Sequence, residues 1–137
     1  MEEIKASDIT LNNWVEYNGK YYKISALSEE YPFLNTDAFG VGVVTYKNIK
    51  GIPLTEDILL KAGAKRLEEN KVAIMLNDPS THLILMNIGT HWYPEIEQTG
   101  ESVSDGVNTV HLNFIDYAHQ AQILFKSLTG NDLKIEV

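Results

Sequence analysis

The chain has 137 residues, of which 44% are hydrophobic and 22% are charged, and its formal net charge is −8. This composition is typical of a globular protein, and the length fits a single domain over residues 1–137 with a sizeable core. The sequence contains no cysteine, which excludes disulfides, thiolate metal sites and cysteine nucleophiles.

The N-terminal residues and the distribution of charge narrow the possibilities further. The start, MEEIKASD, lacks the apolar segment of a secretory signal, and no apolar run approaches the ~18 residues of a membrane span, so we expect a cytoplasmic protein without a membrane segment. Lys and Arg are absent from residues 72–125. Because a nucleic-acid site requires clustered cations, we expect no nucleic-acid binding through this segment. Its acidic surface suits a basic protein partner, a cation or solvent alone.

A hairpin is predicted around Asn18-Gly19, a dipeptide that favours the type I′ turn of a two-residue loop. Side chains alternate along the two strands, so one face is expected to join the core; it carries Val15, Tyr17, Tyr22 and Ile24. The opposite face carries Trp14, Glu16, Tyr21 and Lys23, and Lys23 can lie over Trp14 as a cation–π pair. This second face either packs against a later element or binds a small ligand such as a nucleotide base, with Trp14, Tyr21 and Lys23 as the candidate contacts.

A loop and a glycine-containing strand are predicted next. Residues 28–37 are acidic and include turn-forming residues, which predicts a loop, and residues 39–46 predict a strand. Gly40 and Gly42 form a GxG pattern without a third glycine or a following helix, so a bulge or a close strand crossing is favoured over a phosphate loop.

A short helix and a β-rich region follow. The helix is predicted over residues 55–62, with Thr55 as its N-cap and Gly63 at the C′ position. Strands are then predicted at residues 72–76, 82–88, 90–96 and 109–113. Pro94 has no backbone N–H, so its strand is expected at an edge of the sheet.

The histidines suggest a metal site as one alternative. His82 and His91, with Glu95 or Glu97, supply donors that suit zinc or another divalent ion. Their spacing matches no known motif such as HExxH, so we expect no metal and no cofactor.

A serine triad is the other catalytic alternative. Ser102 or Ser104 can be combined with His111 and Asp116, but no GxSxG motif accompanies them. The sequence therefore predicts no catalytic residue, although a small enzyme or metal protein that uses His82, His91 and His119 stays an alternative.

The clearest element is a helix predicted over residues 114–129, with Asn113 as N-cap, Asp116 at N3 and Gly130 at C′, followed by a short strand. Helical periodicity gives an apolar stripe of Phe114, Tyr117, Ala118, Ala121, Leu124, Phe125 and Leu128. His119, Ile123 and Lys126 lie on the opposite side in this interpretation.

Three polar residues of this helix, and one apolar residue, are candidates for contacts. Gln120 and Gln122 flank the stripe, and His119 and Gln122 are one turn apart, so these residues could contact a ligand. A bond from Gln122 to a backbone group is the favoured interpretation. Ile123 is either a scattered surface residue or part of an interface with another copy of the chain.

The C-terminal segment resembles a group of small uncharacterised proteins of Bacteroidetes bacteria and their phages, which carry an HQxQ…LTGxxL helix. The matching positions are His119, Gln120, Gln122, Phe125, Leu128, Thr129, Gly130 and Leu133. The segments NWVEYNGKYYKI and GIPLTEDILLKAG are similar to the same group in the same order, whereas residues 65–109 have no counterpart. Ala121 stands where leucine is usual. The resemblance implies an origin in a phage or mobile element and implies no activity, cofactor or catalytic residue.

We therefore predict an α+β protein with a small, bent antiparallel sheet, an N-terminal hairpin and two packed helices, with a barrel-like closure as one alternative. The leading functional hypothesis is a non-catalytic binding protein, a phage or mobile-element accessory factor that acts through protein–protein contacts or as a homo-oligomer. The alternative from another class is a binder of a small ligand or nucleotide that uses the basic, aromatic N-terminal half.

Overall fold

The computed structural model describes residues 9–27, 32–35, 40–43, 49–89, 91–99 and 107–136. The chain divides into two compact units. The outer unit consists of Met1–Pro53 and Tyr117–Ile135 with Val137, and the inserted unit consists of Leu54–Asp116 with Glu136. The single domain predicted over residues 1–137 stays a prediction.

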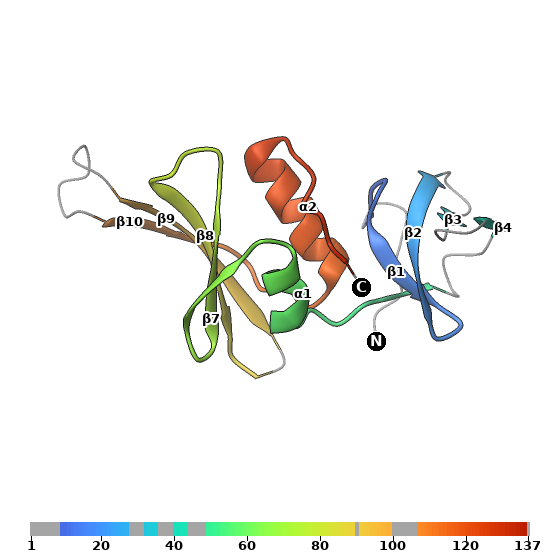
Figure 1. Ribbon diagram of the computed structural model, residues 1–137, viewed down its shortest axis with the longest axis horizontal. Helices are drawn as coiled ribbons and strands as arrows, with labels where there is room; N and C mark the ends of the chain where they lie inside the picture. Colours follow the sequence, from blue (N-terminus) through green and yellow to red (C-terminus); the bar gives the residue numbers. More distant parts are fainter. Residues whose placement is uncertain are drawn as a thin grey trace. The chain divides into compact units, whose positions relative to one another are not determined.

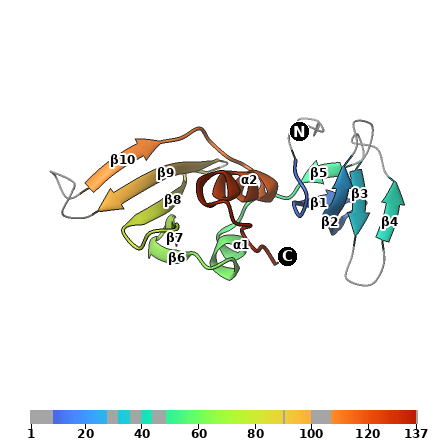
Figure 2. The ribbon, with the colours of Figure 1, turned by 90° about the horizontal axis from the view of Figure 1, so that it is seen from above.

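The outer unit contains a five-stranded antiparallel sheet in the order β4-β3-β2-β1-β5 (Figure 2). Its strands are β1 Trp14–Tyr17, β2 Lys20–Leu27, β3 Pro32–Asn35, β4 Gly40–Val43 and β5 Ile49–Gly51. The predicted hairpin is confirmed: β1 and β2 pair in the expected register, from Trp14 opposite Lys23 to Tyr17 opposite Lys20. Asn18 and Gly19 have φ values of 50° and 76°, the two positive angles that a type I′ turn requires.

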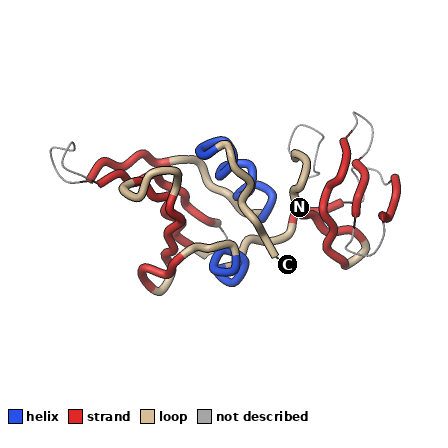
Figure 3. The backbone as a smooth tube through the Cα atoms, turned by 45° about the horizontal axis from the view of Figure 1, so that its top comes forward, coloured by secondary structure: helices blue, strands red, loops and turns tan. Residues whose placement is uncertain are grey.

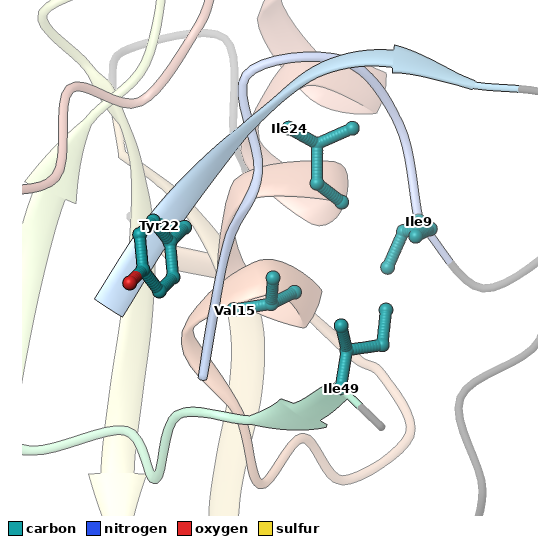
Figure 4. Close-up of a cluster of buried hydrophobic side chains, with 5 residues drawn as sticks. All are labelled: Ile9, Val15, Tyr22, Ile24 and Ile49. Carbon is teal, nitrogen blue, oxygen red and sulfur yellow. The ribbon is translucent and has the colours of Figure 1, made fainter. Parts of the chain in front are cut away.

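The core of the outer unit lies on the predicted face of this hairpin. The buried cluster consists of Ile9, Val15, Tyr22, Ile24 and Ile49, whose side chains are drawn in Figure 4. Tyr17 packs against the cluster and meets Tyr22 edge-on, with their ring centroids 6.1 Å apart. The alternation expected from the sequence therefore assigned the buried face of the hairpin correctly.

Strand β3 corrects one prediction, because it lies inside the segment that was expected to be a loop. Pro32 opens the strand, a position at which the missing N–H of proline is tolerated. The glycine-containing strand is confirmed as β4, and the pairing shifts between Leu34 opposite Gly42 and Asn35 opposite Gly40, as the favoured bulge predicts.

The inserted unit contains a second five-stranded antiparallel sheet, in the order β10-β9-β8-β7-β6. Its elements are α1 Glu56–Lys61, β6 Lys65–Glu68, β7 Lys71–Met75, β8 Thr81–Asn87, β9 Trp92–Thr99 and β10 Val107–His111; Figure 1 shows α1 near β7. Helix α1 begins as predicted, since Thr55 Oγ1 accepts the N–H of Ile58 at 3.2 Å. The helix ends at Lys61, and Gly63 follows with φ +108°.

Pro94 corrects a second prediction, because β9 lies between β8 and β10 and is not an edge strand. The carbonyl of Pro94 accepts the N–H of Leu112 at 3.0 Å, so this residue directs its backbone polar groups toward the β10 side. A backbone N–H at position 94 would donate to Leu112, which lies one residue beyond His111, the last residue of β10. The proline is thus tolerated in an interior strand because the neighbouring strand stops beside it.

Helix α2 spans Ala118–Thr129 and begins four residues later than predicted. Ile115 instead forms a β-bridge with Trp92, and Tyr117 forms one with Pro53. The N-cap is Tyr117, whose N–H donates to Gln120 Oε1 at 3.1 Å, and the helix ends at Gly130 with φ +78°. Asn113 is therefore not the cap, and the short strand predicted after the helix is absent from residues 130–136, which are irregular.

The buried side of α2 also differs from the predicted stripe. Ala118, His119, Ala121 and Gln122 are buried, whereas Leu124, Phe125 and Leu128 are only half-buried and Phe114 is exposed. The α+β class is confirmed, but the described residues form two sheets, and neither closes into a barrel. Neither helix in the described part of the chain has the length and apolarity that a membrane crossing requires.

Candidate functional site

A cavity of about 290 Å³ lies beside the second face of the N-terminal hairpin. It is lined by Asn12, Trp14, Lys23 and Gln122 and by residues 132–135, all of the outer unit. We call it the Trp14 cavity. The side chains of Trp14 and Lys23 meet as the sequence predicts, with Lys23 Nζ 5.8 Å from the centroid of the indole ring.

Gln122 forms one wall of this cavity and is held by two backbone groups. Its Oε1 accepts the N–H of Trp14 at 3.0 Å, and its Nε2 donates to the carbonyl of Asn12 at 3.0 Å. The predicted bond from Gln122 to the backbone is therefore confirmed. These two bonds fix α2 against the residues that lead into β1, and they position the indole of Trp14 at the cavity.

The segment after α2 supplies the opposite wall. Figure 3 shows it as a loop that turns back along the helix. Leu133 and Ile135 are buried, and Lys134 between them is exposed. Asp132 forms an ion pair with Lys126, with 3.1 Å between Oδ1 and Nζ. Among the described residues of the lining, Asp132 is the one acidic residue, and Lys126 offsets its charge. Lys23 and Lys134 therefore give this part of the Trp14 cavity a positive charge.

The remaining predicted contacts of the N-terminal hairpin and α2 lie elsewhere. Tyr21 is exposed and pairs with Glu16 across the hairpin. Gln120 caps the start of α2. His119 is buried and stacks on Tyr117 with 5.7 Å between the ring centroids, so its predicted place on the exposed side of the helix is wrong. Ile123 is half-buried, and its role in an interface stays a prediction.

Two histidines of the inserted unit are paired with separate carboxylates. His91 Nδ1 lies 2.5 Å from Asp116 Oδ1, and His111 Nδ1 lies 3.2 Å from Glu95 Oε2. His82 is opposite Glu97 in the β8–β9 pair. His82 lies at the level of Glu97, and His91 precedes Glu97 by six positions in the sequence. At the rise of a strand, this separation is roughly 20 Å. The two histidines are therefore too far apart to bind one metal ion together.

The alternative triad is not supported by the described residues. His111 is paired with Glu95, and Asp116 is paired with His91, so these two members bind different partners. Ser102 and Ser104 lie outside the described residues. Within the described ranges, no group of three or more His, Asp or Glu side chains is arranged to hold a metal ion.

One face of the inserted sheet is a second candidate, and sequence reasoning missed it. The strand register places one set of side chains on the side opposite Leu83 and Leu85: Lys71, Ala73 and Met75 of β7, His82, Ile84 and Met86 of β8, and Tyr93, Glu95 and Glu97 of β9. Ala73 and Ile84 are buried among their neighbours on this side, whereas Met75 and Met86 are exposed. We call this side the open sheet face. A shallow cavity of about 350 Å³ lies on it between Met86, Tyr93, Glu95 and His111.

An aromatic group borders the open sheet face. The ring of Phe114 stacks on His91 with 5.1 Å between centroids and meets Tyr93 edge-on at 4.3 Å. The sequence signal for this face was the alternation of residues 82–88, in which Met86 falls on the side opposite Leu83 and Leu85. Phe114 was misassigned to a helix, which concealed its place beside the sheet.

Comparisons with known protein families, with curated proteins and with solved structures gave no match. The Trp14 cavity and the open sheet face are thus the two candidate binding surfaces among the described residues.

Proposed function

We propose that this chain is a non-catalytic binding protein that acts through protein–protein contacts, and that its contact surface is the open sheet face. The observation that carries the proposal is the exposure of large apolar side chains there. Met75 is 57% exposed, Met86 is 41% exposed and the neighbouring Phe114 is 48% exposed. Methionine and aromatic side chains are enriched at protein interfaces, where their burial stabilises the complex.

The arrangement of charge on the open sheet face favours a second copy of this chain as the partner. Lys71 lies on β7 and Glu95 and Glu97 lie on β9, on opposite sides of the central strand β8. A two-fold axis parallel to β8, between two facing sheets, places β7 of each copy over β9 of the other. Each lysine then faces the partner's acidic strand, while Met86 and its symmetry mate meet near the axis.

The phage or mobile-element class is part of this proposal. It is supported by the resemblance of residues 119–133 to the HQxQ…LTGxxL helix. In the structure Gln122 of this pattern joins α2 to the backbone of Asn12 and Trp14, and Gly130 ends the helix. These two roles give a structural reason for the pattern and assign it no chemistry.

The mass of the protein in solution tests the proposal. We expect the wild type to be a dimer by light scattering and Met86→Glu to be a folded monomer, because the substitution places a charge at the two-fold axis. Leu60→Glu is the matched control, since Leu60 is an exposed apolar residue on α1. A wild type that is monomeric at roughly 100 μM, or a dimer that survives Met86→Glu, contradicts the self-association.

A charge exchange tests the predicted geometry of the dimer. Lys71→Glu should dissociate the dimer, and the double variant Lys71→Glu with Glu95→Lys should restore it, because the axis keeps every residue at its level along β8 and Glu95 is the acidic residue of β9 nearest to the level of Lys71. Lys71 and Glu95 lie on strands that do not pair with each other within one copy, and they are only two residue levels apart along β8, so the rescue acts between copies. A different rescue partner would leave the face as an interface but refute the two-fold arrangement.

A further inference from the structure

The Trp14 cavity combines a planar aromatic surface with positive charge, in a protein whose net charge is −8. The indole of Trp14 offers a stacking surface, and Lys23 lies over its ring at 5.8 Å. Lys134 extends the positive charge from the opposite wall. Such pairing of an aromatic ring with lysines suits a ligand that has a flat ring at one end and an anionic group at the other.

The walls of the cavity are held in place before any ligand binds. Gln122 fixes the backbone of Asn12 and Trp14 through its two hydrogen bonds. Leu133 and Ile135 anchor the segment that carries Lys134, because both are buried on either side of it. The ion pair between Asp132 and Lys126 fixes the position of the Asp132 carboxylate in the wall of the cavity. A preformed site loses less conformational freedom on binding than a mobile one.

The volume limits the size of the ligand. Ligand sites in proteins enclose about 300–1,000 Å³, and the 290 Å³ of this cavity lies at the lower end of that range. That volume suits one small molecule and is too small for a folded partner or a long nucleic-acid strand. The absence of Lys and Arg from residues 72–125 leaves no such pairing of lysines with an aromatic ring in that segment.

We propose that the Trp14 cavity binds a nucleoside monophosphate, with its base stacked on Trp14 and its phosphate held by Lys23 and Lys134. The base supplies the flat ring, and the phosphate supplies the charge that two lysines neutralise. This site lies in the outer unit and does not depend on the open sheet face. It accordingly goes beyond the proposed self-association.

The two tryptophans make the test direct, because each gives one indole N–H signal in an NMR spectrum. Trp14 lines the cavity, whereas Trp92 is buried and donates its Nε1–H to the carbonyl of Leu54 at 2.9 Å. Titration of the intact chain with adenosine 5′-monophosphate at low salt should shift the Trp14 signal to saturation and leave the Trp92 signal unchanged. A Trp14→Phe variant identifies the two signals.

Lysine variants separate specific binding from a general effect of charge. Lys23→Gln and Lys134→Gln should each weaken binding about fivefold, the effect of one close charge pair in water. Lys20→Gln is the matched control: Lys20 is exposed on the same hairpin and does not line the cavity, so binding should be unchanged. Thermal unfolding of each variant verifies that it is folded, which is expected because all three lysines are exposed.

Partial ligands distinguish the two ends of the site. Adenosine and inorganic phosphate should each bind more weakly than the monophosphate, and adenosine should shift the Trp14 signal more than phosphate does. The proposal is overturned if about 10 mM monophosphate leaves the Trp14 signal in place, since affinity weaker than this is below that of a specific site. It is also overturned if Lys20→Gln weakens binding as much as Lys23→Gln, or if phosphate alone binds as tightly as the monophosphate.

Discussion

Replacing Gln122 by leucine tests how strongly α2 depends on the residues that lead into β1. Gln122 is 6% exposed, and its amide bonds the N–H of Trp14 and the carbonyl of Asn12, both at 3.0 Å. Leucine keeps most of the volume of the side chain but bonds neither group. A buried backbone group that loses its partner costs about 1–3 kcal/mol, so two such losses would cost about 2–6 kcal/mol. Both bonds are only partly buried, so Gln122→Leu should lower the free energy of unfolding by an amount in the lower half of this range.

A Gln122→Glu variant adds a pH dependence of known sign. The carboxylate still accepts from Trp14, but its second oxygen faces the carbonyl of Asn12 without a proton to donate. Burial and that carbonyl both raise the pKa of the introduced carboxyl group above the ordinary value for glutamate, ~4.3. Lys23 and Lys134 of the same cavity act in the opposite direction, but both are exposed, so water screens their effect on this pKa. The pKa of this carboxyl group is then higher in the folded state than in the unfolded state. The variant should therefore become more stable as the pH falls toward ~4.3, the unfolded-state pKa, and less stable as the pH rises above it.

Urea unfolding at pH 7 and at about pH 4.5, close to the ordinary pKa of glutamate, measures both effects. Gln98→Glu is the control, since Gln98 is an exposed glutamine on β9. The reasoning fails if Gln122→Leu lies within about 0.5 kcal/mol of the wild type, the range of an ordinary surface substitution. It also fails if Gln122→Glu and Gln98→Glu respond equally to pH.

Four further predictions follow from individual contacts. Gly51→Ala should destabilise the protein by about 1–3 kcal/mol, because a Cβ there would lie 2.5 Å from Cγ of Tyr117; adding Tyr117→Ala should relieve part of this cost in a double-mutant cycle. Phe125→Ala, at a half-buried position, should cost less than Leu59→Ala, at a position with no exposure, for which we expect about 2–5 kcal/mol in urea unfolding. Ile123→Ser should leave the dimer mass unchanged in light scattering if the open sheet face is the interface, and a monomer would instead assign the interface to α2. EDTA should leave the unfolding midpoint unchanged, and a large shift would reveal a bound metal.

Features fixed by local chemistry were predictable from the sequence. The register of the hairpin follows from the turn preference of Asn18-Gly19, and the start of α1 follows from the hydroxyl of Thr55. The contact of Lys23 with Trp14 follows from that register. Each of these depends on residues within about ten positions of one another.

Features fixed by distant partners could not be predicted in the same way. Ile115 and Tyr117 are held in extended bridges by Trp92 and Pro53, and this pairing overrides the helical pattern that begins at Phe114. Strand β6 was missed because its sequence, KRLE, is exposed throughout and shows no apolar alternation. In the Trp14 cavity, Trp14, Lys23 and Gln122 were candidate contacts from the sequence. Lys134 joins them because the chain turns back after α2, and that turn could not be predicted from local chemistry.

The bridge between Pro53 and Tyr117 has a consequence for the order of folding. The chain leaves the outer unit after Pro53 and returns at Tyr117, and the inserted unit holds its own ends together through a 2.9 Å bond from the N–H of Leu54 to the carbonyl of Asp116. During synthesis from the N-terminus, residues 54–116 are complete while the outer sheet still lacks α2. An inserted unit that folds at that stage turns a long open loop into a short one, so α2 meets β1 at a lower entropic cost. The folded insertion would then hold Pro53 and Tyr117 close together, so that α2 can pack against β1.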